Sequence, residues 1–93
     1  MIRVSGDRVE VSGPMTMAAA AVMLADGEAA IAANASVFDL AAVTDMDSSC
    51  LAVIFGWMRA ARDSGKAVRL LNPPQNLLSL AEVYGVSDLL PQH

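Results

Sequence analysis

Short alternations of apolar and polar residues open the chain and predict a β-hairpin. Residues 2–4 and 9–11 alternate in this way, and the polar segment 5–8 joins them and contains a glycine. Alternation of apolar and polar residues with a period of two is typical of half-buried strands. A short connecting segment that contains glycine favours a hairpin turn. The pair Gly13-Pro14 predicts the end of the second strand, because proline cannot donate a hydrogen bond to a sheet.

The next apolar segment predicts a helix. Residues 16–33 are rich in Ala, Met and Leu, which are strong helix formers. The side chains expected on its core face are Met17, Ala20, Ala21, Leu24 and Ile31. Gly27 lies in the middle of the segment, and glycine weakens a helix by about 1 kcal/mol relative to alanine. We therefore expect this helix to be frayed or broken near Gly27.

Two short apolar segments downstream predict buried strands, and each precedes a predicted helix. The strands are expected at 37–40 and 67–71, and the helices at about 49–64 and 75–84. Residues 44–49 have the polar composition of a turn and a helix cap. The core face of the longer helix is expected to consist of Leu51, Ile54, Phe55, Met58 and Ala61.

The order of these elements is β-β-α-β-α-β-α, and it predicts a single α/β domain over residues 1–93. Strands that alternate with helices after an initial hairpin form a mixed sheet with the helices packed on it. We expect three main helices, and a tail at residues 86–90 that lies against the body. Pro91 is expected to close the fold.

The composition and charge of the chain limit the classes of partner that it can bind and the compartment in which it can act. The chain has 93 residues, 55% of them hydrophobic, a formal net charge of −4 and one cysteine. A negative chain is a poor ligand for nucleic acid or anionic membranes, and a lone cysteine fits a reducing compartment. The N-terminus does not have the pattern of a signal peptide, and the apolar run 15–24 is too short to span a bilayer. We expect a soluble, cytoplasmic protein that reaches a membrane only through a partner.

Three residues at the start of the second long helix are candidates for function. Asp47, Ser48 and Ser49 precede or begin this helix, where side-chain oxygens cap free N–H groups and where anions bind. Val53 and Trp57 form a second apolar stripe on the helix, which indicates a docking face, because tryptophan is frequent at interface hot spots. The alternative is that Trp57 folds back on the sheet.

A group of basic residues and several weaker patterns are further candidates for function. Arg59, Arg62 and Lys66 lie at helical spacing and indicate either a solvated face or a contact with an acidic patch of a partner. Asp39, Asp45 and Asp47 are too sparse a pattern to predict a metal site, and Cys50 has no histidine near it in sequence. No phosphate-binding loop is present either. We therefore expect no catalysis, cofactor or metal.

The segment 43–54 resembles the strand-to-helix signature of STAS domains, and the resemblance covers essentially the whole chain. Anti-sigma-factor antagonists of this family carry a similar Asp-Ser-Ser-Gly-Leu, whose second serine accepts a phosphate from a partner kinase. The resemblance implies that Ser49 is the phosphoacceptor here. The chain departs from the motif at Cys50, where those proteins have glycine.

The MlaB-like branch of the STAS family is similar at two places. Its Asp-Thr-Gly-Gly-Leu-Ala aligns with residues 47–52, and its Leu-Ala-x-x-Tyr helix and Leu-Pro ending align with residues 80–84 and 90–91. This resemblance implies a non-catalytic regulatory or assembly subunit. Its partner would be the cytoplasmic ATPase of a bacterial ABC phospholipid transporter that maintains outer-membrane lipid asymmetry.

The expected partner-binding residues are Asp47, Ser48, Ser49, Val53 and Trp57. The alternative function is that of an anti-sigma-factor antagonist, a phosphorylatable switch that binds an anti-sigma kinase. Both functions involve docking onto another protein, and they differ in the partner and in whether Ser49 is modified.

Overall fold

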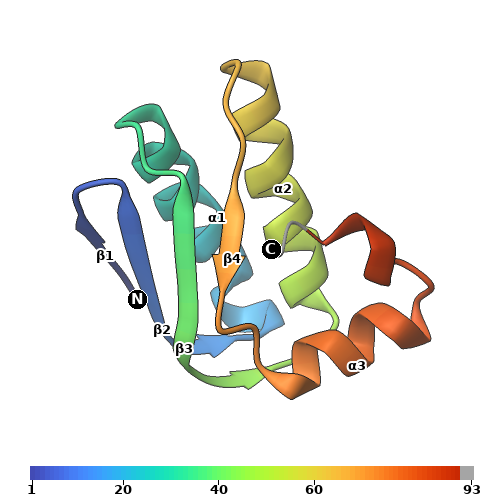
Figure 1. The fold of residues 1–93 in the computed structure, drawn as a ribbon. Coiled ribbons are helices and arrows are strands. Elements are labelled where there is room, and N and C mark those ends of the chain that lie inside the picture. The colour runs from blue at the N-terminus through green and yellow to red at the C-terminus, as the bar shows by residue number, and fades with distance from the viewer. Residues whose placement is uncertain (91–93) are drawn as a thin grey trace.

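The computed structural model describes residues 1–90 and contains a four-stranded sheet in the order β1-β2-β3-β4 (Figure 1). The strands are β1 (Ile2–Ser5), β2 (Arg8–Met15), β3 (Val37–Met46) and β4 (Arg69–Leu71). The hairpin β1-β2 is antiparallel, whereas β3 pairs in parallel with both β2 and β4. The predicted mixed sheet with an N-terminal hairpin is confirmed.

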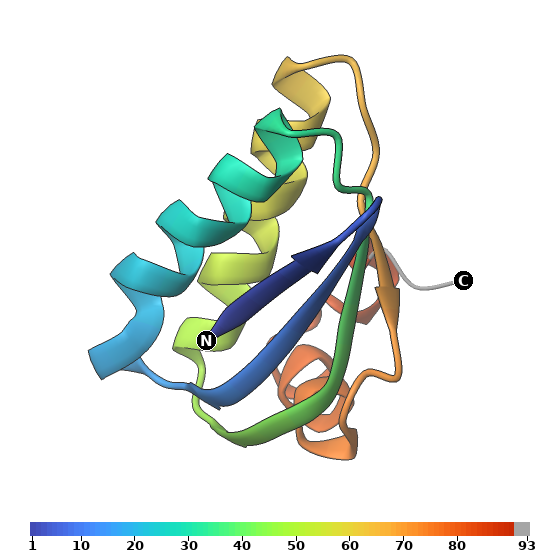
Figure 2. The ribbon, with the colours of Figure 1, turned by 90° about the vertical axis from the view of Figure 1, so that its left-hand side faces the viewer.

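Three main helices accompany the sheet, as predicted, and a short 3₁₀ turn follows them. They are α1 (Met17–Ala32), α2 (Ser49–Asp63), α3 (Gln75–Val83) and the turn η1 (Ser87–Leu89). The helices α1 and α2 lie side by side over one face of the sheet (Figures 1 and 2). Helix α3 contacts α2 and lies beyond the end of β4 (Figure 1).

Side chains point alternately to the two faces along each strand, so one face of the sheet is buried and the other is exposed. Val9, Phe38 and Leu70 are paired across β2, β3 and β4, and all three are buried beneath the helices. The next paired residues along these strands include Glu10 and Asp39, which point to the opposite face because side chains alternate. The core therefore lies between one face of the sheet and the helices α1 and α2.

Strands β2 and β3 are longer than the sequence predicts. Gly13 and Pro14 lie inside β2, so the expectation that they end the strand is wrong. Gly13 has a φ of 80°, and the pairing with β3 shifts between Gly13 and Pro14, which is the geometry of a bulge. A bulge near the edge tolerates the missing N–H of proline. Strand β3 continues to Met46 because its second half pairs with this end of β2.

Helix α1 is continuous through Gly27, contrary to the expected break. Gly27 is buried against the indole of Trp57, and a Cβ at this position would overlap the indole ring. The Trp57 Nε1–H donates to the Met23 carbonyl oxygen at 3.2 Å, and the indole lies 4.4 Å from the Phe38 ring between centroids. Glycine is present here because the two helices approach closely.

The buried side of α1 also differs from the prediction. Its buried residues are Met23, Gly27, Ala30 and Ile31, whereas Met17 is 76% exposed. After α3, the chain turns through η1, and Leu90 is buried against the body as expected. The expectation for Pro91 lies outside the described residues. Within residues 1–90, no helix is both long enough and apolar enough to cross a membrane.

Candidate functional site

The carboxylate of Asp47 joins the starts of two helices. Its Oδ2 accepts the backbone N–H of Met17 at 3.1 Å, and its Oδ1 accepts the N–H of Ser49 at 2.8 Å. Met17 begins α1 and Ser49 begins α2. One side chain therefore caps both helices, at the edge where the parallel strands β2 and β3 end. We call residues Asp47, Ser48 and Ser49 the junction.

These two backbone bonds favour the charged form of Asp47. The N–H groups of Met17 and Ser49 hold the pKa of the Asp47 carboxyl below its usual value of 3.8. Helix N-termini favour anions, so the location acts in the same direction. Asp47 is ionised at neutral pH, and its negative charge is exposed at the surface.

Ser48 and Ser49 differ in accessibility and in their bonds. Ser48 is exposed and precedes α2, but its side chain makes no capping hydrogen bond. The expectation that Ser48 caps the helix is therefore wrong, because Ser48 has helical φ and ψ angles of −61° and −18°, and the N–H groups of Cys50 and Leu51 bond to backbone carbonyl oxygens. Ser49 is half-buried in the first turn. The Ser48 hydroxyl remains available to a partner molecule.

Val53 and Trp57 do not lie on an outer face of α2. Val53 is 2% exposed and Trp57 is 0% exposed, because the side of α2 that carries them is covered by α1 and the sheet. Neither side chain is accessible to a partner in this structure, and the expectation of a docking face on this stripe is wrong. The alternative for Trp57, that it folds back onto the sheet, is what the structure contains.

The acidic residues weighed as metal ligands are separated. Asp39 lies on the exposed face of the sheet, where it accepts the Ala41 N–H and an Asn72 amide N–H, each at 3.0 Å. These bonds lower the pKa of Asp39, and an Arg8 guanidinium 3.9 Å away acts in the same direction. Among residues 1–90, no three His, Cys, Asp or Glu side chains are grouped as metal ligands would be.

Cys50 lies next to the junction but points into the core. Burial and, to a smaller extent, the negative charge of Asp47 raise the pKa of the Cys50 thiol to about 11. A thiol with such a pKa is protonated at neutral pH, and the thiolate is the reactive form. Cys50 is therefore a packing residue.

Apolar side chains flank the junction on both sides. On the α1 side, Met17 is 76% exposed and Val22 is 64% exposed. On the α3 side, Val83 is 81% exposed and borders a shallow cavity of about 300 Å³. This cavity is lined by Met46, Asn76, Ser79, Leu80 and Val83. The junction is thus a polar centre with an apolar border.

The apolar border was not among the expectations from the sequence. One signal was present, because residues 15–25 contain no charged side chain and so supply no polar face to an amphipathic helix. Such a helix is either buried all round or exposes an apolar face. In the structure, α1 exposes Met17 and Val22 together with a row of alanines. Large exposed apolar side chains that cluster mark interaction surfaces.

The fold is that of a small α/β domain of the STAS type. A family model described as "Mlab, STAS domain" matches residues 2–91, and the chain belongs to this family. The resemblance stated from the sequence is confirmed.

Relatives of known name and structure agree with this assignment. The chain is 35% identical over 51 residues to the intermembrane phospholipid transport system binding protein MlaB of Haemophilus influenzae. The match covers 55% of this chain and 49% of the relative, about half of its length. The anti-sigma factor antagonist SpoIIAA in its unphosphorylated form is similar in structure, with a TM-score of 0.66 at 19% identity over 88% of this chain and 80% of that one. The phosphorylated Bacillus SpoIIAA gives 0.68 at 18% identity, over 100% and 89%. These structures show the shared fold.

Proposed function

We propose that this chain is a non-catalytic subunit that docks through the junction and its apolar border onto the ATPase of a bacterial ABC phospholipid transporter. The observation that carries the proposal is the exposed Asp47 junction beside the exposed Met17 and next to the cavity that Met46 and the exposed Val83 line. The similarity to a phospholipid transport system binding protein supports the choice of partner. The chain would act on the cytoplasmic side and reach the inner membrane through the ATPase.

The chemistry of the surface fits a protein partner. Interfaces combine a buried apolar centre with polar groups that fix orientation, and methionine adapts to imperfect fits. The outer face of α1 supplies apolar area and contains no basic residue, while Asp26 and Asp47 add negative charge nearby. The matching surface of the ATPase is therefore expected to be apolar with a basic border.

The same residues argue for a binding role. The Asp47 carboxylate is occupied by two backbone N–H groups, which leaves it a weak base with a lowered pKa. The Cys50 thiol is protonated and buried. Neither group has the properties of a general base or an activated nucleophile.

Affinity purification from the native bacterium tests the proposal. The tagged chain, expressed at its natural level, should co-purify an ABC ATPase that mass spectrometry identifies, and the purified pair should form a complex in solution. Removal of the chain should lower the ATPase activity or the amount of assembled transporter. Co-purification of a different class of protein, with no binding to the ATPase in solution, would overturn the proposal.

A second candidate is a phosphorylatable switch that binds an anti-sigma kinase. The specific observation in its favour is the exposed Ser48 and half-buried Ser49 at a helix N-terminus, which is a favourable place for a phosphate. The similar SpoIIAA structures are of unphosphorylated and phosphorylated forms. Co-purification of a kinase, together with phosphate on Ser49 in intact-mass and fragment spectra, would favour this candidate over the first.

A further inference from the structure

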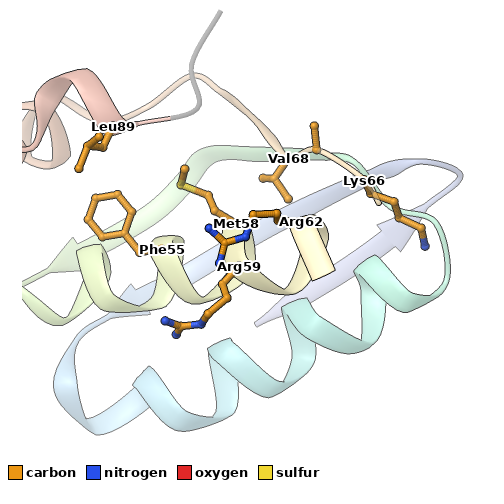
Figure 3. Close-up of a pocket in the computed structure, with 8 residues that line it drawn as sticks. Phe55, Met58, Arg59, Arg62, Lys66, Val68 and Leu89 are labelled. Carbon is orange, nitrogen blue, oxygen red and sulfur yellow. The ribbon is translucent and has the colours of Figure 1, made fainter. Parts of the chain in front are cut away.

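A second surface lies at the other end of α2 from the junction. A cavity of about 490 Å³ opens there, between the second half of α2, the segment before β4, and η1. Its apolar floor consists of Phe55, Met58, Val68 and Leu89, and Arg59 and Arg62 form its rim (Figure 3). Phe55 and Met58 were expected in the core, but they are half-buried because they line this cavity.

The two arginines of the rim form no ion pair within residues 1–90. Within residues 1–90, the ion pair present joins Arg8 to Asp39, so Arg59 and Arg62 have no carboxylate within 4.0 Å. Both guanidinium groups are exposed and lie one helical turn apart on α2. A cation in the last turn of a helix is common, which accounts for Arg62 but not for Arg59 a turn earlier.

The third basic residue of this region has a different role. The Lys66 Nζ donates to the Ile31 carbonyl oxygen at 2.8 Å and so caps the end of α1. Figure 3 shows this ammonium directed away from the cavity. The charge offered to a ligand is therefore that of the two arginines, which bind carboxylates in planar, bidentate geometry.

We propose that this cavity binds a short segment of a partner protein in which an Asp or Glu stands beside a bulky apolar side chain. The carboxylate pairs with Arg59 and Arg62, and the apolar side chain rests on Phe55, Met58 and Leu89. Charge complementarity favours an acidic occupant. The rim is positive although the chain as a whole carries a net charge of −4. The site shares no residue with the junction, so it does not depend on which protein binds there.

The openness of the cavity favours a protein segment over a small molecule. Leu89 is 58% exposed although it lines the cavity, and small-ligand sites normally enclose most of the ligand. A small amphiphile would leave much of its surface in water here. A protein segment covers the open side with its own backbone and neighbouring residues.

Peptide selection followed by titration tests this proposal. A phage-displayed library of random dodecamers is selected on the full chain, and the enriched peptides are synthesised and measured by calorimetry. Peptides with a carboxylate beside Leu, Ile or Phe should be enriched. Their affinity should fall roughly tenfold or more for Arg59→Glu/Arg62→Glu and several-fold for Leu89→Ala. The substituted side chains are exposed, and circular dichroism verifies that the variants are folded.

A control variant places the same change of charge elsewhere. Arg3→Glu/Arg69→Glu alters two exposed arginines of β1 and β4 and should leave the peptide affinity unchanged. Enriched peptides that lack carboxylates, a library that yields no peptide dependent on the two arginines, or equal binding to Arg59→Glu/Arg62→Glu would overturn the proposal. Arginine-dependent binding of dodecanoate without such peptides would also overturn it, in favour of a small-amphiphile site.

Discussion

The close packing of Gly27 against Trp57 gives the sharpest prediction about the fold. Gly27→Ala introduces a methyl group that would lie 2.7 Å from the Trp57 Cδ1 and closer still to Nε1 and Cε2. By helix propensity alone this change should stabilise α1 by about 1 kcal/mol. The structure predicts the opposite sign, because the indole is 0% exposed and is held by the Phe38 ring and the Met23 carbonyl oxygen.

The expected size follows from three contributions. Overpacking a core costs about 1–3 kcal/mol, and loss of the Trp57 Nε1–H bond to the Met23 carbonyl oxygen costs about 1 kcal/mol more. The gain in helix propensity offsets about 1 kcal/mol of this. We expect Gly27→Ala to lower the free energy of unfolding by about 1–3 kcal/mol. For a domain of this size, each kcal/mol corresponds to roughly 4–8 °C in Tm.

Urea titrations followed by circular dichroism measure the effect. Ala25→Gly, at an exposed position of α1, reports the local propensity contribution and should cost about 1 kcal/mol. Trp57→Ala removes the whole indole that the new methyl meets, so Gly27→Ala should cost less in this background. If Gly27→Ala is as stable as the original chain, or the cost is equal in both backgrounds, the packing argument is refuted.

The junction and the buried thiol give two further predictions. Because its two N–H bonds depress the Asp47 pKa, the ionised side chain stabilises the fold above the usual value of 3.8, and this stabilisation is lost as the pH falls through the depressed pKa. Asp47→Asn should thus lower Tm at pH 7 and converge with the original chain in acid, while Ser48→Ala leaves Tm unchanged; a pH-independent difference would contradict this. The Cys50 thiol, with its pKa raised to about 11, should react with a disulfide reagent at pH 8 only at the rate of unfolding, and immediate labelling of the folded chain would contradict its burial.

Local sequence patterns predicted the order of elements and the place of the junction. The alternation in residues 2–11 and the polar cap before residue 49 are short-range signals, and the structure confirms the hairpin and the helix start. The extension of β2 through Pro14 was not predictable, because it depends on a bulge and on pairing with β3. Proline normally ends a strand.

The docking residues could be predicted only in part. Asp47 and Ser48 are exposed and Ser49 is half-buried, so a partner could reach them. Val53 and Trp57 are buried. A helical wheel shows two apolar stripes on α2, but it does not show that α1 covers one of them. That coverage depends on Gly27, which lies 30 residues before Trp57 and admits the indole. The exposed face of α1 could be identified only from the structure, which shows which sides of α1 and α2 pack against each other and against the sheet.

Titration of the purified ATPase with matched variants tests directly whether the partner binds at the junction. Met17→Glu and Val83→Glu place a charge in the exposed apolar border, where a dry contact would lose affinity by desolvation. Val4→Glu makes the same change at a side chain that is 48% exposed on β1, away from the junction. If the partner binds at the junction, the two border variants should bind the ATPase at least about tenfold more weakly, while Val4→Glu should bind like the original chain. Equal binding by all three folded variants would contradict binding at the junction.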